Sequence, residues 1–285
     1  MIETDLTEEA GKKVRGSLLR VEMTPYELTE FAKAYNRENS HARNYDEPDF
    51  CKLDWQKSVE LLERGWPEGS RKIETKVGQI LTALGDREGF GIERDITGDY
   101  LDVADFLSGE PECFHKIVLQ ERPEQEVEVH VNISYSCGVK KECVFNRGAV
   151  ITAVLDELRK HYFVRVVVHM GGRDFSGSQK WDNIDFRIHF DTSNLYSRSF
   201  FAFMCANEAV LRRLDFSLVE HYEDKDYISG YGMPFSFTKK TDIPENAVLF
   251  DEIRNNSNWD SIEKAKDQLK SVLKKHNITL EGVPA

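Results

Sequence analysis

Three side chains that carry oxygen atoms, Asn132, Ser134 and Ser136, alternate just after a stretch with the pattern of a β-strand. Residues 127–133 alternate apolar and polar side chains, which is the period of a half-buried strand. Hydroxyl and amide oxygens are ligands for hard cations such as Mg²⁺, although a neutral amide binds them less well than a carboxylate. The stretch therefore predicts either a weak metal site or side chains that cap the loop and the helix after it.

Residues elsewhere in the chain could complete such a site. Asp191 and Thr192 follow a second alternating stretch, residues 184–190, and sites in α/β folds gather beyond the ends of such strands. Glu110 and Glu112 either cap the predicted turn 109–112 or face the loop 132–136 and replace its missing carboxylate. Trp66 is expected to close the helical layer against the sheet or to line the same cleft. The candidate cleft thus comprises Asn132, Ser134, Ser136, Asp191, Thr192, Glu110, Glu112 and Trp66.

Four histidines, His130, His169, His189 and His221, fall in or beside predicted strands. Their rings could converge into one site. Isolated histidines, each satisfied by its own hydrogen bonds, are the more common arrangement, so convergence is not the expectation.

The elements that would position these side chains begin with a strand, a helix and a second strand. From Asn146, the expected N-cap, apolar residues recur at helical spacing to about residue 160. Residues 164–170 are rich in β-branched side chains and predict an interior strand, so the two strands would form a parallel crossover. Further strands are expected at 184–190 and 216–221, and further helices at 197–214 and 260–276.

The N-terminal third is expected to be mainly helical. Thr24, followed by Pro25, starts one helix, Asp54 starts a second that ends at Gly65, and a third runs to about residue 85. We therefore expect three regions: a helical region 1–95, an α/β core 96–222, and residues 223–285, whose loop and terminal helix pack on the core or on a partner.

The pattern Asn132-x-Ser134-x-Ser136 resembles the Asp-x-Ser-x-Ser start of the metal-ion-dependent adhesion site in von Willebrand factor A domains. The leading carboxylate of that motif is an amide here. The resemblance implies an α/β fold with a mainly parallel sheet flanked by helices. It implies Mg²⁺ at Ser134, Ser136 and Asp191 if any metal binds, and the expectation is that no cofactor does.

Two further motifs carry a second resemblance. Gly65-Trp66-Pro67-Glu68-Gly69 and Leu107-Ser108-Gly109-Glu110-Pro111-Glu112-Cys113 are similar to runs in an uncharacterised domain family found mostly in bacteriophages. The similarity spans about residues 55 to 220 and implies a phage origin without implying a reaction.

Composition excludes several classes of function. The net charge of −12 argues against nucleic-acid binding by charge alone. No apolar run approaches the roughly 20 residues that span a bilayer. Five cysteines without paired spacing favour a reducing compartment, and the acidic N-terminus is unlike a signal peptide, so the host cytoplasm is the expected location.

The function predicted from these observations is a phage-encoded, non-enzymatic protein–protein interaction module, because no sequence motif of a known enzyme class is present. Its partner would be a host factor, a defence protein or a phage assembly component, and homo-oligomers are also expected. The alternative is a Mg²⁺- or Mn²⁺-dependent enzyme acting on a phosphoester or nucleotide. That enzyme would use Ser134, Ser136, Asp191 and a carboxylate from Glu110 or Glu112.

Overall fold

The computed structural model describes most of the chain, and the statements below concern those residues. They are residues 2–4, 18–44, 51–82, 94–95, 100–101, 114–115, 126–172, 181–191, 198–225, 233–237 and 243–275. The turn expected over residues 109–112 lies outside them.

A six-stranded mixed sheet forms the centre of the protein, in the order β1-β2-β8-β7-β6-β9. The pairs β2–β8, β7–β6 and β6–β9 are parallel, whereas β1–β2 and β7–β8 are antiparallel. An α/β fold with a mainly parallel sheet is therefore confirmed, including the parallel crossover from β6 to β7. The strands are β1 (Ile2–Thr4), β2 (Leu18–Met23), β6 (Glu126–Asn132), β7 (Phe163–Met170), β8 (Asn183–Asp191) and β9 (Val248–Phe250).

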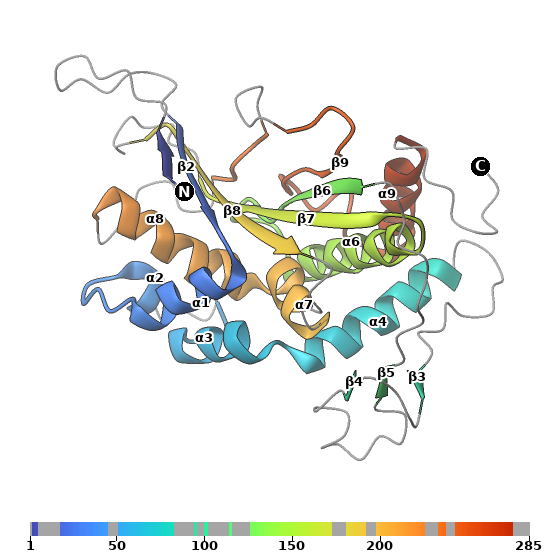
Figure 1. Ribbon diagram of the computed structural model, residues 1–285, viewed down its shortest axis with the longest axis horizontal. Coiled ribbons are helices and arrows are strands. Elements are labelled where there is room, and N and C mark those ends of the chain that lie inside the picture. Colours follow the sequence, from blue (N-terminus) through green and yellow to red (C-terminus); the bar gives the residue numbers. More distant parts are fainter. Residues whose placement is uncertain are drawn as a thin grey trace.

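Helices cover one face of this sheet in two layers, which lie below the strands in Figure 1. The inner layer holds α6 (Lys141–His161), α7 (Arg198–Ala206), the π-helix η1 (Val210–Asp215) and α8 (Phe216–Glu223). Helix α1 (Pro25–Ala34) packs directly on β2 and β8, and the outer layer holds α2 (His41–Asn44), α3 (Trp55–Arg64) and α4 (Pro67–Thr82). Helix α9 (Ile262–Lys275) packs on α6 and α4.

A second, three-stranded sheet has the order β3-β5-β4, from Arg94–Asp95, Phe114–His115 and Tyr100–Leu101. None of the described helices combines the length and apolar character that a membrane crossing requires.

Local capping signals explain where the N-terminal helices begin. The amide N–H of Glu27 donates to Thr24 Oγ1 at 3.2 Å, and the Thr24 N–H donates to the Glu27 carboxylate at 2.7 Å, which completes a capping box. The Lys57 N–H donates to Asp54 Oδ1 at 2.6 Å at the start of α3. Gly65 ends α3 with a φ of 82°. The predictions for these two helices are confirmed.

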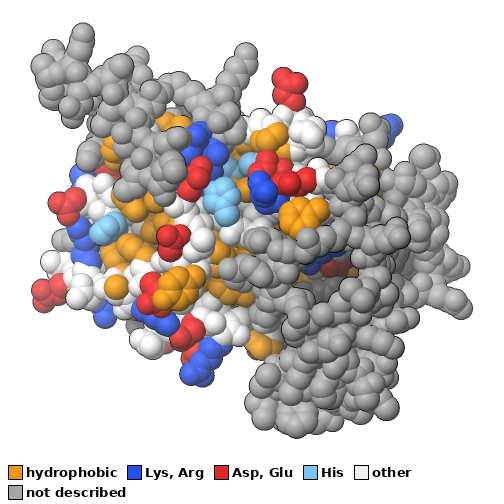
Figure 2. Space-filling view, viewed as in Figure 1, with side chains coloured by type: hydrophobic (Ala, Val, Ile, Leu, Met, Phe, Trp, Pro, Cys, Tyr) orange, Lys and Arg blue, Asp and Glu red, His pale blue; other side chains and the backbone are white. Residues whose placement is uncertain are grey.

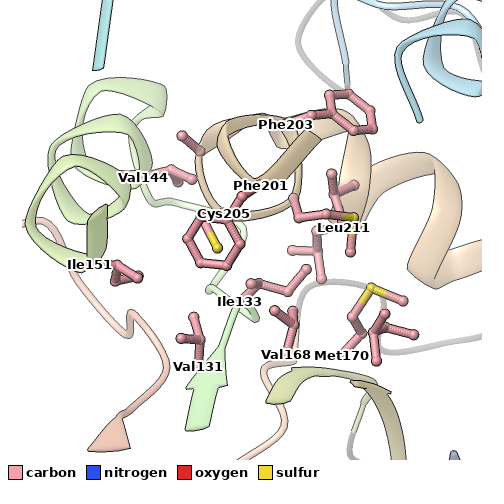
Figure 3. Packing of buried hydrophobic residues seen from close by; sticks show 14 of the residues in the cluster. Val131, Ile133, Val144, Ile151, Val168, Met170, Phe201, Phe203, Cys205 and Leu211 are labelled. Carbon is pink, nitrogen blue, oxygen red and sulfur yellow. The ribbon is translucent and has the colours of Figure 1, made fainter. Parts of the chain in front are cut away.

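The hydrophobic core lies between the sheet and the inner helices. Alternate residues of β6 and β7 turn their apolar side chains toward α6 and α7, as Figure 3 shows. Removing this apolar area from water supplies the main favourable term for the fold, at about 25 cal/mol per Å². The side chains labelled there include Val131, Ile133, Val168 and Met170 from the sheet side and Val144, Ile151, Phe201 and Cys205 from the helices.

Two predictions about this core are wrong. Residues 216–221 form helix α8 rather than a strand, because they continue the helical turns of η1 and are buried on nearly every side, which hides the helical period. Asn146 is not an N-cap, since α6 begins at Lys141 and the Asn146 side chain donates to the Trp259 carbonyl at 2.7 Å. The helix expected over residues 197–214 is divided into α7 and η1.

Replacing Gly171 by alanine is expected to lower the free energy of unfolding by roughly 2–4 kcal/mol, since backbone strain and steric overlap each cost about 1–3 kcal/mol. Gly171 follows β7 with a φ of 137°, and a Cβ there would lie 1.9 Å from the Ile184 carbonyl oxygen. Urea denaturation followed by circular dichroism measures the change.

Gly78→Ala is the matched control. Gly78 is exposed within α4 and a Cβ there would meet no atom within 4 Å, so alanine should stabilise by up to about 1 kcal/mol. Equal effects of the two substitutions would contradict the steric argument.

Candidate functional site

The sheet face opposite the core carries charged and histidine side chains on four adjacent strands. We call this set the polar face. Figure 2 shows histidine, acidic and basic side chains next to one another over β6, β7 and β8. The opposite side of the same strands is almost entirely aliphatic and aromatic, so the two faces differ sharply in chemistry. The polar face comprises Arg20 and Glu22 of β2, Asp185, Arg187 and His189 of β8, Arg165 and His169 of β7, and Glu128, His130 and Asn132 of β6.

Three buried residues of the polar face form a continuous hydrogen-bonded chain, which we call the relay. His130 Nδ1 lies 2.8 Å from His169 Nε2, and His169 Nδ1 lies 2.8 Å from Asp185 Oδ1. The side chains of His169 and Asp185 are fully buried, and that of His130 is 3% exposed. The relay therefore joins β6, β7 and β8 beneath the surface.

Asp185 fixes a proton on one nitrogen of the relay, His169 Nδ1. Burial alone would raise the pKa of Asp185, but the charges and hydrogen bonds of His169 and Arg187 outweigh it, so the pKa is lowered and the carboxylate is ionised. The ionised group accepts from His169 Nδ1 and, at 2.9 Å, from Arg187 Nε. The facing nitrogens His130 Nδ1 and His169 Nε2 share one proton, so one of them donates to the other.

The outer nitrogen of His130, Nε2, lies beside the Glu128 carboxylate. His130 Nε2 lies 3.5 Å from Glu128 Oε2, and no hydrogen bond reaches the nitrogen from the part of the chain that the structure describes. Burial, together with the neighbouring His169 and Arg187, lowers the pKa of His130 to about 3, so the ring is neutral at physiological pH. The Glu128 side chain is 26% exposed and forms the solvent side of this pair.

A second group of titratable side chains lies across the sheet from Glu128. The Glu22 carboxylate is 4.0 Å from Arg187 Nη1 and 3.7 Å from His189 Nε2. Burial lowers the pKa of His189, which Glu22 only partly opposes, while its side chain remains 38% exposed. His130 and His189 are both in register with Val167, one strand away on either side. Two strand spacings place them about 10 Å apart.

Aromatic rings from residues 233–237 pack over the centre of the relay. The Phe235 ring is stacked on His169 with centroids 6.4 Å apart, and the Phe237 ring meets it edge-on at 4.9 Å. The Asn132 amide donates to the Phe235 carbonyl at 2.8 Å and holds this segment in place. Apolar cover of this kind strengthens the electrostatic interactions beneath it.

The loop 132–136 is closed by hydrogen bonds within the protein. Asn132 Oδ1 accepts from the Ser134 N–H at 3.0 Å, and the Ser134 hydroxyl donates to the Gly171 carbonyl at 3.4 Å. Asn132 and Ser134 are fully buried, whereas Ser136 is half-buried and donates its N–H to the Ile253 carbonyl. Among the described residues, no three or more His, Cys, Asp or Glu side chains are grouped so that they could hold a metal. These hydrogen bonds hold the loop itself, whereas α6 after it begins without a side-chain N-cap bond.

Arg147 lies directly behind this loop. Its guanidinium group donates to the carbonyls of Asn132 at 2.7 Å, Phe250 at 3.0 Å and Asp251 at 2.7 Å. Burial lowers the pKa of Arg147 to about 10, which leaves the group charged at neutral pH. A fixed positive charge thus occupies the place where β6 and β9 end side by side.

The other candidate residues are dispersed. The Trp66 ring packs edge-on against Phe145 with centroids 6.4 Å apart, in the helical layer, as the first of the two alternatives expects. Asp191 ends β8 in register with Arg165, on the strand that carries His189. The side chain of Asp191 and all of Glu110, Glu112 and Thr192 lie outside the described residues.

The expectation that the strand histidines are isolated is wrong for His130 and His169, whose rings share a hydrogen bond, and His189 lies on the same face. His221 does not join them. It is exposed on α8 and packs edge-on against Phe31 and Tyr222.

Asp185 is the functional residue that sequence reasoning missed. Its polar position in the alternating stretch 184–190 was the available signal.

Two buried carboxyl groups in the helical layer differ in how they are satisfied. Glu220 accepts hydrogen bonds from the Tyr35 hydroxyl, the Ser40 hydroxyl and the Ala42 N–H at 2.6, 2.6 and 2.8 Å. Neither oxygen of Asp215, at the end of η1, accepts a hydrogen bond of normal geometry from a described residue. Burial raises the pKa of Asp215 to about 8, and the nearby Gly171 backbone offsets only part of this effect.

Comparison with known proteins gives a family match and nothing further. A family model with the description "Domain of unknown function (DUF7192)" matches residues 12–280. The match confirms an uncharacterised domain family and extends beyond the 55–220 segment in which the motifs lie. No curated protein and no solved structure matches the chain.

Proposed function

We propose that this chain, which belongs to the DUF7192 family, is a hydrolase whose active site is the polar face. The observation that carries the proposal is the relay, which ends in an unpartnered His130 nitrogen beside Glu128. The proposed substrate class is a small phosphoester or nucleotide.

Energetic cost supports the assignment of a function to the relay. Burying titratable groups costs free energy that apolar side chains in the same positions would not incur. The helix-facing side of the same strands shows that this sequence can supply such side chains. Buried groups with strongly perturbed pKa values gather at functional sites, and His130 and Asp185 are two of them.

The chemistry follows from what the relay contains. It has no hydroxyl or thiol, so the nucleophile is a water molecule rather than a side chain. Activation of that water takes place at the outer end of the relay, where the partly exposed Glu128 carboxylate beside His130 would take its proton. Val167, which lies between His130 and His189 in the register of the sheet, is buried, so a substrate would reach this row through the partly exposed Glu128, Glu22 and His189.

Arg187 is buried and paired with Asp185 and Glu22, whereas Arg165 is half-exposed and paired with Glu126, so an anionic substrate would be bound by Arg165 in exchange for Glu126. Arg165 is in register with Glu128, and Arg187 is in register with His169. Guanidinium groups match the geometry of phosphate oxygens and stabilise charge that develops on them. The half-exposed His189 and Glu22 lie across Val167 and are placed to exchange a proton with the leaving group.

The test is hydrolysis of p-nitrophenyl phosphate, bis(p-nitrophenyl) phosphate and p-nitrophenyl acetate by the whole chain. Turnover of at least one compound is expected, and His130→Gln should lower kcat by about 10²–10⁴-fold, the usual effect of losing an acid–base group. His221→Gln, which alters an exposed histidine on α8, should leave kcat unchanged. Equal losses in both variants, or no turnover of any compound, would reject the proposal.

Partner binding, the function that the sequence favours, is the second candidate. The net charge of −12 favours it, because an acidic surface complements a basic partner. In the described part of the chain, Tyr26 and Met233 are the only large hydrophobic side chains that are exposed, so such a partner would be held through polar contacts. Phage origin, action in the host cytoplasm and homo-oligomer formation remain predictions that accompany either function.

The fold itself is proposed to be similar to a von Willebrand factor A domain. The parallel crossover through α6 and the position of the loop 132–136 at the carboxyl end of β6 support this similarity. Hydrolysis at the polar face does not require metal binding by that loop.

A further inference from the structure

Both oxygens of the Asp185 carboxylate are engaged, and they hold two different side chains. Oδ1 accepts from His169 Nδ1 at 2.8 Å, and Oδ2 accepts from Arg187 Nε at 2.9 Å. The side chains of Asp185 and His169 are fully buried, and that of Arg187 is 7% exposed. An ionised carboxylate can only accept hydrogen bonds, so each neighbour presents a proton to it whatever the charge of the His169 ring.

The His169 contact continues along the relay toward Glu128. His169 Nε2 lies 2.8 Å from His130 Nδ1, and His130 Nε2 lies 3.5 Å from Glu128 Oε2. The second of these contacts is longer than an ordinary hydrogen bond, so the His130 ring is held mainly from its inner side. We call Glu128 and His130 the first pair.

The Arg187 contact continues in the other direction, toward Glu22 and His189. Arg187 Nη1 lies 4.0 Å from Glu22 Oε1, and Glu22 Oε2 lies 3.7 Å from His189 Nε2. These separations are those of charge attraction rather than of hydrogen bonds, and the attraction between charges about 4 Å apart is strong where water is partly excluded. We call Glu22 and His189 the second pair; both side chains are 38% exposed.

The two pairs have the same composition and lie on opposite sides of one residue. Each is a carboxylate beside an imidazole ring, and the two rings, His130 and His189, are in register with Val167 from β6 and β8. Asp185 connects with both pairs, through one oxygen to each. A carboxylate suits this position because it offers two acceptor oxygens, whereas an amide offers one.

From this arrangement we infer that Asp185 is the shared positioning residue of both pairs, so that loss of its carboxylate disturbs the two pairs together. The inference rests on the proposed hydrolase, in which the first pair accepts a proton from the attacking water and the second exchanges one with the leaving group. Asp185 is fully buried and acts through His169 and Arg187 rather than on the substrate. One buried group thus sets the geometry at both ends of the reaction.

The test is nitrogen-15 NMR of the His130 and His189 rings in the whole chain at pH 7, because the shifts of the ring nitrogens report the tautomer and charge of each ring. Asp185→Asn leaves one acceptor oxygen for two donors, so the signals of both rings should shift. Arg187→Lys keeps the charge but replaces the guanidinium fork by a single point of contact, so mainly the His189 signals should shift. Asp224→Asn, at a side chain that is 91% exposed, should move neither ring.

A kinetic measurement accompanies the spectra. For any of the three p-nitrophenyl compounds that the wild type hydrolyses, Asp185→Asn should lower kcat about 10²-fold and leave KM nearly unchanged, because small misplacements of reacting groups have effects of this size. Asp224→Asn should have the kcat of the wild type.

The inference is overturned if folded Asp185→Asn leaves the signals of either ring unchanged. If Asp185→Asn does not fold, Arg187→Lys decides, and His189 signals identical to those of the wild type overturn the inference. Its failure is distinct from failure of the proposed function. Hydrolysis with an unchanged kcat in Asp185→Asn would reject the positioning role and retain the hydrolase. Shifts of both rings in a protein that hydrolyses none of the compounds would retain the positioning role and reject the hydrolase.

Discussion

Replacing Asp185 by asparagine is expected to lower the free energy of unfolding by about 3–5 kcal/mol, the cost of breaking a buried charged pair. The carboxylate accepts from His169 Nδ1 and Arg187 Nε with its two oxygens. The amide has a single acceptor oxygen for these two donors, so one donor is left unpaired in the interior. Urea denaturation of both proteins at pH 7 measures the difference.

Asp224→Asn provides the matched control for this substitution. The Asp224 carboxylate pairs with Arg37 at 2.5 Å, but its side chain is 91% exposed, and such surface pairs contribute below about 1 kcal/mol. Asparagine also tolerates the positive φ of 54° at this position. A loss at Asp185 as small as the loss at Asp224 would show that the relay is not a buried charged network.

The pH dependence of the Asp185 effect has a definite sign. The pKa of Asp185 is lowered in the folded protein, so its contribution to stability is fully present above the ordinary aspartate pKa. It is lost as the pH falls through the lower folded value. The difference between wild type and Asp185→Asn should therefore shrink under acid conditions.

Asp215→Asn is expected to have the opposite effect and to stabilise the protein at pH 8 by roughly 3–5 kcal/mol, at about 1.4 kcal/mol for each unit of pKa difference. Burial raises the pKa of this carboxyl group from 3.8 to about 8. Between these values the folded state holds a proton that the unfolded state has released, so wild-type stability falls as the pH rises from about 4 to about 8. The asparagine variant lacks this decline.

Thermal or urea unfolding of wild type and Asp215→Asn at intervals from pH 4 to pH 9 provides the measurement. Asp224→Asn serves again as the control and should follow the wild-type profile. Parallel profiles for wild type and Asp215→Asn would mean that Asp215 is ionised in the folded state through contacts that relieve its burial.

Local features of the sequence predicted much of the fold. The Thr24 and Asp54 caps, the alternation in 127–133, the β-branched side chains of 164–170 and the glycine at 65 each depend on residues within a few positions of one another. Such features can be recognised in the sequence because the residues that interact lie within one short segment. Helix α8 shows the limit, since a helix buried on nearly every side loses the polar stripe that marks its period.

The relay could not be predicted because it depends on register. His169 lies opposite Asn132 and Arg187, and Asp185 contributes one row further along β8. A shift of one residue in either pairing would turn His130 or Asp185 into the core. The register of these strands depends on packing between segments that are far apart in the chain. His130 and Asp185, for example, are 55 residues apart. A strand as short as β9 has too few residues to show a recognisable sequence pattern.

Arg147 constrains the order in which parts of the polypeptide can fold during synthesis. Its three carbonyl acceptors come from residues 132, 250 and 251. Before residues 250 and 251 have left the ribosome, a nascent chain that closes its core around α6 would bury the Arg147 guanidinium group with two of its three carbonyl acceptors missing. The N-terminal helices can form early, whereas the carbonyls around Arg147 at the end of β6 are complete only after β9, an edge strand, has been made. Fragments that stop before residue 250 should therefore remain bound by chaperones instead of reaching a native state.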